Sequence, residues 1–390
     1  MRRAEFGRRS PGRLVPITVD ERGSRVDHVA FIPSPLPAEF TLDNKTWLTV
    51  FEATRNLTRL NAIVEERLPN RKLLVRPTIR REAVSTSAIE GTFTSIPDVM
   101  RSDTDRTLPR SAAVSEVLNF VRATEYAIKR RASLPISVRF ACEIHSILMK
   151  GTPGEDWQVG RLRRTQVFIG SGGRRSVRHA NYVPPPPGDN LRDGLSHWEK
   201  WIHADSNMHP LVRVAAAHYQ FEALHPFTDG NGRIGRLLAV LQIMDYGLLS
   251  DPIVNLSPYI EAHADEYRKR LRDVSTKGDW DAWIRFFCAA LAEQAFDAEV
   301  RVRALLIWRD AMLERLRARK VKGVALRVVA DLIAHPSVTV KSISSTHKVS
   351  IQAANQAVAR LVELRIIKEI TGKQHGRMFE ASDVYEILSR

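Results

Sequence analysis

The stretch HPFTDGNGRIGR, residues 225–236, constrains the fold more than any other part of this chain. It separates two apolar runs that are each long enough for a helix, residues 210–224 and a run that ends at Gly247. Pro226 cannot continue the first helix because it lacks an amide hydrogen, and the glycines of DGNG allow the positive φ angles of a tight turn. We therefore expect two helices joined by a sharp corner, with His225 at the end of the first.

The beginning of the second helix is expected to bind an anion. Its backbone N–H groups, at Gly230, Asn231 and Gly232, have no intrahelical partners and lie at the positive end of the helix dipole. Arg233 and Arg236 are three residues apart, so they share one helix face, and guanidinium groups can grip phosphate oxygens bidentately.

The same corner carries the groups for metal binding and for proton transfer. Asp229 suits Mg²⁺ that bridges phosphates, because such sites use one or two carboxylates. His225 lies beside the anion site, where a general base takes a proton from a hydroxyl. The spacing matches neither a P-loop nor a dinucleotide-binding turn after a strand. These residues predict a site for nucleotide phosphates, a divalent metal and a nucleophile that must be deprotonated.

The stretch resembles the signature of the Fic family, HPFx[D/E]GNGRxxR, and matches it at every specified position. The resemblance extends to VGRLRRTQVFIG and YVPPPP, which are similar to the family's target-positioning flap, and to residues 257–287, which are similar to its downstream helices. Many members have Asn-Trp where this chain has Val167 and Phe168. The expected flap residues are Arg163, Gln166, Phe168, Ile169 and Tyr182.

The resemblance implies a protein adenylyltransferase that moves AMP from ATP to a Ser, Thr or Tyr hydroxyl of a target protein, with the chain itself as a second candidate target. His225 would be the base, with Asn231 and Arg236 as further catalytic residues, and Phe227 would pack inward to fix the loop. Asp229 would hold Mg²⁺, and the phosphates would be bound by Gly230, Asn231, Gly232, Arg233 and Arg236.

A second stretch, REAVSTSAIEGTF, matches the family's inhibitory motif [S/T]xxxE[G/N] at Thr86, Glu90 and Gly91. The resemblance implies that Glu90 pairs with Arg236 and keeps ATP from a reactive pose, so that the chain inhibits itself. Gly91 is expected to end the helix that carries Glu90. In some relatives the same glutamate supports removal of AMP, and the sequence leaves that side activity open.

The whole chain has 390 residues and a formal net charge of +15, which favours contact with polyanions. Its two cysteines, Cys142 and Cys288, lie in apolar surroundings and fit buried thiols of a cytoplasmic protein. No apolar run is long enough to span a membrane, and the basic N-terminus lacks the apolar core of a secretory signal. We expect residues 1–30 to be a flexible basic arm.

The expected fold is mainly α, with a Fic-type helical core, a small β-hairpin flap and a C-terminal winged helix-turn-helix. The N-terminal Fic region with its inhibitory helix is expected at 31–110, the catalytic core at 111–318 and the winged helix at 324–390. Strand-like residues flank a Gly/Arg turn within 163–183, which predicts the hairpin.

The winged helix leaves two readings open. Its expected recognition helix, about 350–364, carries Asn355, Gln356 and Arg360, which can contact base edges or phosphates. Residues 324–390 hold nine Lys and Arg against six Asp and Glu, a net of +3, which is a modest footprint for DNA. A protein-interaction or dimerisation module, including a homodimer, fits as well. The alternative function is therefore a DNA-binding regulator whose Fic core senses nucleotide, and a third is transfer of another phosphate-containing group.

Overall fold

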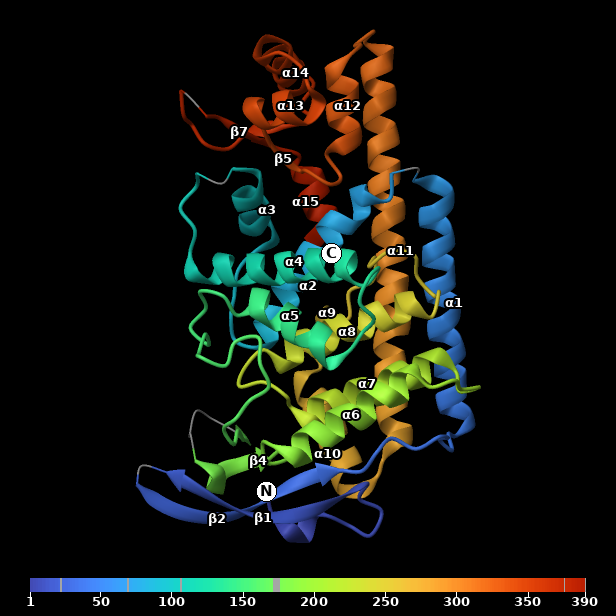
Figure 1. Cartoon of the computed structure of the whole chain (residues 1–390). Coiled ribbons are helices and arrows are strands. Elements are labelled where there is room, and N and C mark those ends of the chain that lie inside the picture. The colour runs from blue at the N-terminus through green and yellow to red at the C-terminus, as the bar shows by residue number, and fades with distance from the viewer. Residues whose placement is uncertain (22, 69, 106, 171–175, 375, 390) are drawn as a thin grey trace.

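The computed structural model describes residues 1–21, 23–68, 70–105, 107–170, 176–374 and 376–389. Within these ranges the protein is mainly α-helical and carries three small antiparallel sheets (Figure 1). The expectation of a mainly α fold is confirmed. None of the described helices combines the length and the apolar character needed to cross a bilayer.

Two helices at the centre, α7 (Pro210–Leu224) and α8 (Asn231–Asp245), position the candidate site. Both are buried on nearly every side, as expected for helices whose apolar residues are not confined to one face. They pack against each other and are covered by helices from the rest of the chain. The sharp corner between them is the one predicted from residues 225–236.

The N-terminal helices surround this pair. They are α1 (Asn44–Arg67), α2 (Lys72–Ile89), α3 (Ile96–Thr104), α4 (Ala112–Arg130) and α5 (Val138–Leu148). Side-chain oxygens of Asp43, Ser95, Ser111 and Ser137 accept backbone N–H groups at their first turns, which explains where four of these helices begin. Pro77 lies inside α2, although proline more often stands in the first turn of a helix.

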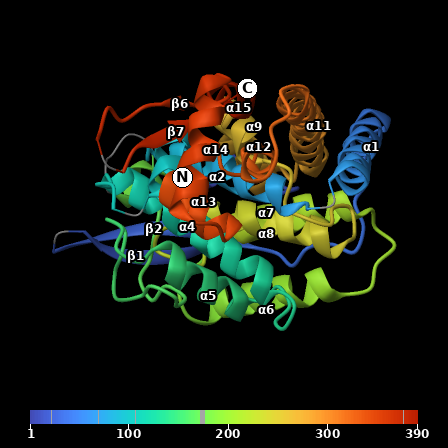
Figure 2. The ribbon, with the colours of Figure 1, turned by 90° about the horizontal axis from the view of Figure 1, so that it is seen from above.

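The later helices complete the body. They are α6 (Asp189–His203), α9 (Ser257–Ala262), α10 (Ala264–Lys277) and α11 (Trp280–Ala318). Helices α9 and α10 are separated at His263, whose backbone leaves the helical region. The long helix α11 runs beside α1 along one edge of the molecule (Figures 1 and 2).

The N-terminus is not the flexible arm that the sequence predicted. After a short turn η1 (Arg3–Glu5), strands β1 (Gly12–Glu21) and β2 (Ser24–Pro33) form an antiparallel hairpin. The Phe31 ring is fully buried beside Phe6 and Tyr182, and the Phe31 N–H donates to the carbonyl of Val183 at 2.9 Å. The hairpin is therefore packed because its apolar residues cover the region that was expected to be the flap.

That region forms the second small sheet. Strand β3 (Ile169–Gly170) pairs with β4 (Ala180–Tyr182), which follows the short turn η2 (Val177–His179). Part of the predicted Gly/Arg turn, residues 171–175, lies outside the described residues. Val177, Ala180 and Val183 share a separate apolar cluster with Val26 and Ala30 of β2. The flap region is thus supported by the N-terminal hairpin.

The C-terminal part contains the three helices and the hairpin that the sequence predicts. They are α12 (Val324–Asp331), α13 (Val340–His347), α14 (Ile351–Glu363), β6 (Lys368–Glu369) and β7 (Met378–Glu380). Strand β5 (Ser337–Thr339), which was not predicted, completes a sheet of order β5-β7-β6. A last helix, α15 (Ser382–Ser389), was also not predicted and packs against α11 and α3.

Polar contacts join this C-terminal part to the N-terminal helices. Arg101 on α3 donates from Nε and Nη2 to the two carboxylate oxygens of Glu380, at 2.6 and 2.9 Å. Arg81 on α2 donates to the carbonyl of Leu388 at 2.7 Å. Glu380 is 4% exposed, and Arg101 is the cation that pairs with its buried carboxylate.

We expect Arg101→Ala to lower the free energy of unfolding by about 1–3 kcal/mol, because a buried carboxylate loses its charged donor. Urea unfolding of the full chain measures this. The control is Arg268→Ala, whose partner Asp265 is fully exposed and whose loss should cost about 0–1 kcal/mol. Equal effects of the two substitutions would show that the Arg101–Glu380 contact does not hold the C-terminal part in place.

Candidate active site

His225 ends α7 in a left-handed conformation, with φ of 50°. A non-glycine residue in this region is strained by about 1–3 kcal/mol and needs support from its surroundings. The His225 Nδ1 lies 3.3 Å from the carbonyl of Glu222, an acceptor, so Nδ1 carries the proton. The other ring nitrogen, Nε2, is then the unprotonated one and can accept a proton from a substrate.

The electrostatic surroundings keep this imidazole neutral. Burial lowers the pKa of His225 to about 4, and the nearby positive charge of Arg163 acts in the same direction. Glu90 and Asp229 act against this shift without cancelling it. A neutral imidazole at physiological pH is the form that a general base requires.

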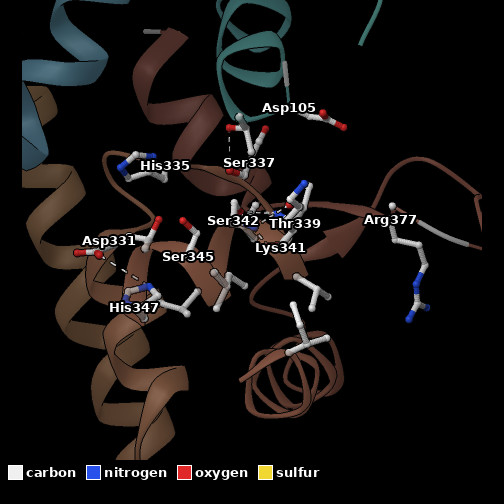
Figure 3. Close-up of a pocket in the computed structure, with 18 of the residues that line it drawn as sticks. Asp105, Asp331, His335, Ser337, Thr339, Lys341, Ser342, Ser345, His347 and Arg377 are labelled. Carbon is white, nitrogen blue, oxygen red and sulfur yellow. Dashed lines mark hydrogen bonds and ion pairs between the residues drawn. The ribbon is translucent and has the colours of Figure 1, made fainter. Parts of the chain in front are cut away.

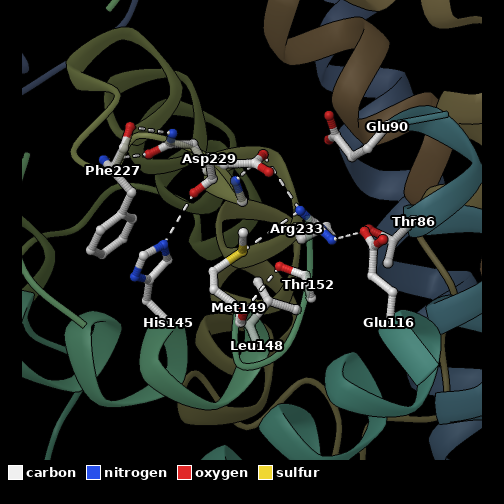
Figure 4. A network of polar contacts seen from close by, with 12 residues as sticks. Thr86, Glu90, Glu116, His145, Leu148, Met149, Thr152, Phe227, Asp229 and Arg233 are labelled. Atoms are coloured by element: carbon white, nitrogen blue, oxygen red, sulfur yellow. Dashed lines mark hydrogen bonds and ion pairs between the residues drawn. The ribbon is translucent and has the colours of Figure 1, made fainter. Parts of the chain in front are cut away.

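The corner after His225 is held rigidly from within. The Asn231 side chain accepts from the Phe227 N–H at 2.8 Å and donates to the Phe227 carbonyl at 2.9 Å. Phe227 is fully buried, as predicted, and stacks on His145 with ring centres 4.1 Å apart (Figure 4). The amide of Asn231 is therefore committed to the loop, and only its backbone N–H is available to a ligand.

His145 on α5 is a support that the sequence analysis did not include among the site residues. Its Nδ1 accepts from the Gly160 N–H at 2.8 Å, so its Nε2 donates to the carbonyl of Asp229 at 3.2 Å. Burial lowers its pKa to about 4, which keeps the ring neutral and this donor arrangement fixed. The position of Asp229 is thus set by a helix more than 80 residues earlier in the chain.

Arg163, one of the expected flap residues, supports the same corner from inside the protein. Its guanidinium donates to the carbonyls of His225 at 2.8 Å and Pro185, and its backbone N–H donates to Pro226 at 3.0 Å. The side chain is 2% exposed, and burial lowers its pKa to about 10. An arginine in a Gly- and Pro-rich loop suggests a surface residue, whereas this one satisfies buried backbone carbonyls.

The other expected flap residues differ in exposure. Gln166 donates to the carbonyls of Val167 and Pro184 and so braces the flap. Tyr182 donates to the carbonyl of Ala223 at 2.8 Å, which joins β4 to α7. Phe168 packs against the apolar cluster under the hairpin. Ile169 is exposed, and it is the member of this set that a target chain can reach.

The first turn of α8 has the free backbone N–H groups that the predicted anion site requires, with one difference. The N-cap is Gly230, with φ of 77°, and the first bond within the helix runs from Ile234 N–H to the Gly230 carbonyl. The N–H groups of Asn231, Gly232 and Arg233 therefore precede the intrahelical ladder. The Gly230 N–H, however, already donates to the Asp229 carboxylate at 2.6 Å.

Asp229 remains suited to a divalent cation. Its side chain is 48% exposed, and its nearest cation is Arg233, whose Nη2 lies 3.4 Å from Oδ1. Among the described residues, no group of three or more His, Cys, Asp or Glu side chains could hold a metal alone. Mg²⁺ does not require such a group, because it commonly uses one or two carboxylates and substrate phosphates. The donor set therefore fits Mg²⁺ bound together with a phosphate ligand.

The two arginines of α8 have different partners. Arg233 forms an ion pair with Glu116 of α4, which the sequence analysis did not identify (Figure 4). Its side chain is 2% exposed and its Nε lacks a hydrogen-bond partner within the described residues. Arg233 is thus held at the edge of the anion site by a second helix.

Arg236 is joined to α2, as predicted. Its Nε donates to the Thr86 hydroxyl at 2.8 Å, and its Nη2 donates to the Thr86 carbonyl at 3.2 Å and to Glu90 Oε1 at 2.8 Å. Gly91, with φ of 92°, follows the end of the helix and directs the chain away. The structure therefore brings together Thr86, Glu90, Gly91 and Arg236.

The Glu90 carboxylate also lies against the first turn of α8. A Cβ atom added to Gly232 would come within 2.6 Å of Glu90 Oε1 and 2.8 Å of Arg236 Nη1. Burial raises the pKa of Glu90, but the charge and the hydrogen bond of Arg236, together with the charge of Arg233, outweigh it and leave the pKa below its ordinary value. An ionised carboxylate thus occupies the place where the helix N-terminus and Arg236 would bind a phosphate oxygen.

Glu222 is a second acid near Arg236 that sequence reasoning missed. Burial raises its pKa to about 7, Arg236 lowers it, and Glu90 raises it further. Its Oε1 is buried without a hydrogen-bond partner in the described part of the chain and lies where a Cβ at Gly235 would come within 2.7 Å. A polar residue three positions before His225, inside an apolar helix, was the available signal.

Comparison with known proteins gives a consistent picture. Residues 135–243 match the model of the Fic/DOC family, and residues 47–129 match the model of the Fic/DOC family N-terminal region. The chain is 33% identical over 156 residues to a protein adenylyltransferase Fic of Culex quinquefasciatus, covering 40% of this chain and 26% of that one. It is 39% identical over 166 residues to one of Drosophila grimshawi, covering 42% and 30%. The chain spans about a quarter to a third of the length of these relatives.

Solved structures show the same fold. A crystal structure of a Fic family protein from Desulfovibrio desulfuricans matches with a TM-score of 0.59 and 20% identity, over 89% of this chain and 98% of that one. A fragment of Fic-1 from C. elegans matches with a TM-score of 0.51 and 24% identity, over 65% and 72%. The first of these likenesses extends across nearly the whole chain.

The His225 environment predicts an unusual titration. Since burial and Arg163 hold its pKa near 4, we expect the ring to stay neutral down to about pH 5. NMR of the nucleotide-free protein with labelled histidine measures this, with the His225 resonances assigned by their absence in His225→Gln. A midpoint near 6.5, the ordinary value for histidine, would contradict this description of the site.

Proposed function

The chain belongs to the Fic/DOC family, and we propose that it is a self-inhibited protein adenylyltransferase. The observation that carries this proposal is the position of the Glu90 carboxylate, which binds Arg236 and lies against the first turn of α8. This carboxylate occupies the position proposed for a phosphate oxygen of ATP. His225, the proposed proton acceptor, lies in the same corner between α7 and α8. The adenylyltransferase names of the matching relatives agree with this chemistry.

In the proposed reaction, ATP places its β- and γ-phosphates at the first turn of α8 and Arg236. The target hydroxyl gives its proton to His225 Nε2, and its oxygen attacks the α-phosphorus. The bond from the α-phosphorus to the bridging oxygen breaks, and pyrophosphate leaves with the electron pair. The backbone N–H groups of α8 and the arginines stabilise the charge on the phosphates, which is the larger part of such catalysis.

Asp229 is the residue that would hold Mg²⁺, and the ion would neutralise charge on the phosphates of ATP. His145 and the Gly230 N–H fix the position of Asp229, so its carboxylate is oriented before a ligand arrives. Glu116 performs a similar task for Arg233, which it anchors beside Asp229. His145 and Glu116 are therefore proposed as positioning residues, which do not touch the reacting atoms.

The proposed inhibition follows from competition for one cation. Arg236 is 1% exposed and has its strongest partner in Glu90, so a γ-phosphate must displace that carboxylate. Ile169 on the exposed edge of β3 is the proposed contact with the target chain. Removal of AMP, with Glu90 as the supporting acid, is a second reaction proposed for this site. Modification of the chain itself is a further outcome of the same chemistry.

We expect incorporation of label from ATP carrying a labelled α-phosphate, with Mg²⁺ and a lysate of candidate targets. Glu90→Gly should exceed wild type by about tenfold or more, equivalent to roughly 1.4 kcal/mol or more of barrier, since Arg236 is released. Glu90→Gly with His225→Ala should show none. Label on the enzyme itself is counted separately.

The matched control is Glu66→Gly, which removes an exposed glutamate near the end of α1. It should label at the wild-type rate. Absence of label from Glu90→Gly would count against AMP transfer and favour a different phosphate-containing donor, or a regulator whose core only senses nucleotide. Equal label from Glu66→Gly and Glu90→Gly would count against the inhibitory role of Glu90.

A further inference from the structure

A large groove lies where the C-terminal part meets α2 and α3 (Figure 3). Its volume is about 990 Å³, which is large enough for a polymer backbone. One wall comes from α13, α14 and the hairpin of β6 and β7, and includes Lys341, Asn355 and Arg377. The other wall comes from α2 and the end of α3, and includes Arg76, Asp103 and Asp105.

The first wall has the arrangement of a helix-turn-helix with a wing. Helices α13 and α14 are joined by a short turn in which Lys348 adopts φ of 52°, and β6 and β7 form the hairpin that follows. In such domains the second helix enters the major groove of DNA with its N-terminal residues toward the bases. Here that helix is α14.

The outer face of α14 carries the chemistry for reading bases. Its inner face buries Ala354, Ala357, Val358 and Leu361, so the helix orientation is fixed. The exposed side of its first half carries Gln352, Asn355 and Gln356. Side-chain amides of this kind recognise adenine through paired hydrogen bonds in the major groove.

The C-terminal part has more exposed cations than exposed acids. Glu380 pairs with Arg101, and Asp383 accepts from the Trp308 indole. Asp331 lines the groove beside His347, and Glu363, Glu369 and Glu386 are exposed. Six cations of the C-terminal part are exposed and form no ion pair among the described residues: Lys341, Lys348, Arg365, Lys368, Lys373 and Arg377. The positive surface of this region is therefore formed largely by these six side chains.

We propose that the face formed by α13, α14 and the wing, at the edge of this groove, binds duplex DNA, with α14 in the major groove and the cations of α13 and the wing on the phosphates. Exposed cations that neutralise phosphates release counterions, which supplies most of the affinity at low salt. A protein partner is the competing occupant. The amide-bearing α14 face and the unpaired cations favour DNA, because protein interfaces are depleted in lysine.

Asp105 opposes this ligand. It lies at the far wall of the groove, where hydrogen bonds from Thr107 lower its pKa and the charges of Lys373 and Lys341 lower it further. The carboxylate thus shares two cations with the phosphates that would bind there. Its removal should tighten DNA binding, an effect that is not expected for a groove whose ligand is itself cationic.

A ligand in this groove also touches the helix that ends in Glu90. Arg76 belongs to α2, lines the groove, and pairs with Asp103 at 2.6 Å. From Arg76 to Glu90 is about 21 Å along the helix axis, at 1.5 Å per residue. Bound DNA is therefore expected to change the release of Glu90 from Arg236, a consequence that rests on the proposed transferase function.

The binding test uses the full chain without nucleotide and fluorescence anisotropy of a labelled duplex of mixed sequence, from about 50 to 200 mM salt. We expect Lys341→Glu with Arg377→Glu to weaken binding at least about tenfold and to flatten the salt slope by about 2, as loss of two phosphate contacts requires. Asp105→Asn should bind more tightly than wild type. Circular dichroism confirms that each variant is folded.

The matched control is Lys45→Glu with Lys129→Glu, two exposed lysines outside the groove, which alters the net charge by the same amount. It should bind within about twofold of wild type. Equal loss in both double variants would overturn the groove as the site. Absence of duplex binding at 50 mM salt, tighter binding of single-stranded RNA, or binding of a protein partner alone would overturn DNA as the ligand.

The coupling test measures label transfer with saturating duplex. We expect at least a twofold change in wild type and none in Glu90→Gly, where the inhibitory contact is already absent. Duplex binding without any change in the wild-type rate would overturn the coupling and leave the groove assignment intact. Absence of label from all variants would contradict the transferase proposal. The anisotropy results would still show whether duplex DNA binds at the groove.

Discussion

The structure depends on one buried arginine, Arg236, whose hydrogen-bond partners come from another helix. Arg236 lies on a helix that is buried on nearly every side, and a buried guanidinium must be paired and hydrogen-bonded. The pairing comes from α2, which offers the Thr86 hydroxyl, the Thr86 carbonyl and the Glu90 carboxylate. The N-terminal region is therefore bound to the core at the very place where the core would bind a nucleotide.

The remaining features of the site follow the same rule. His225 and Gly230 bend the chain by adopting left-handed conformations, and the bend is stable because buried groups outside it satisfy its backbone. Arg163 donates a hydrogen bond to the His225 carbonyl before the turn. Within the turn, Asn231 accepts from the Phe227 N–H, and His145 donates to the Asp229 carbonyl. Catalytic geometry and fold stability are thus carried by the same hydrogen bonds, which explains why so few of these side chains are free.

Local pattern was enough to predict the corner of α7 and α8 and the helix that ends at Gly91, because proline, glycine and apolar runs act within a few residues. The pairing of Glu90 with Arg236 came from the family resemblance, since their separation of 146 residues leaves no local trace. Glu116 and the inward Arg163 were missed for that reason. The N-terminal hairpin was missed because its arginines dominate the composition, while the burial of Phe31 depends on partners far along the chain.

The central claim is that Glu90 withholds Arg236 from the γ-phosphate. Calorimetry with ATP and with AMP, on wild type and Glu90→Gly in the presence of Mg²⁺, tests it most directly. The account predicts that Glu90→Gly binds ATP at least about tenfold more tightly than wild type does, a gain of roughly 1.4 kcal/mol, while AMP affinity changes little because AMP lacks the group that Arg236 would hold. Equal gains for ATP and AMP, or no gain for ATP, would contradict it.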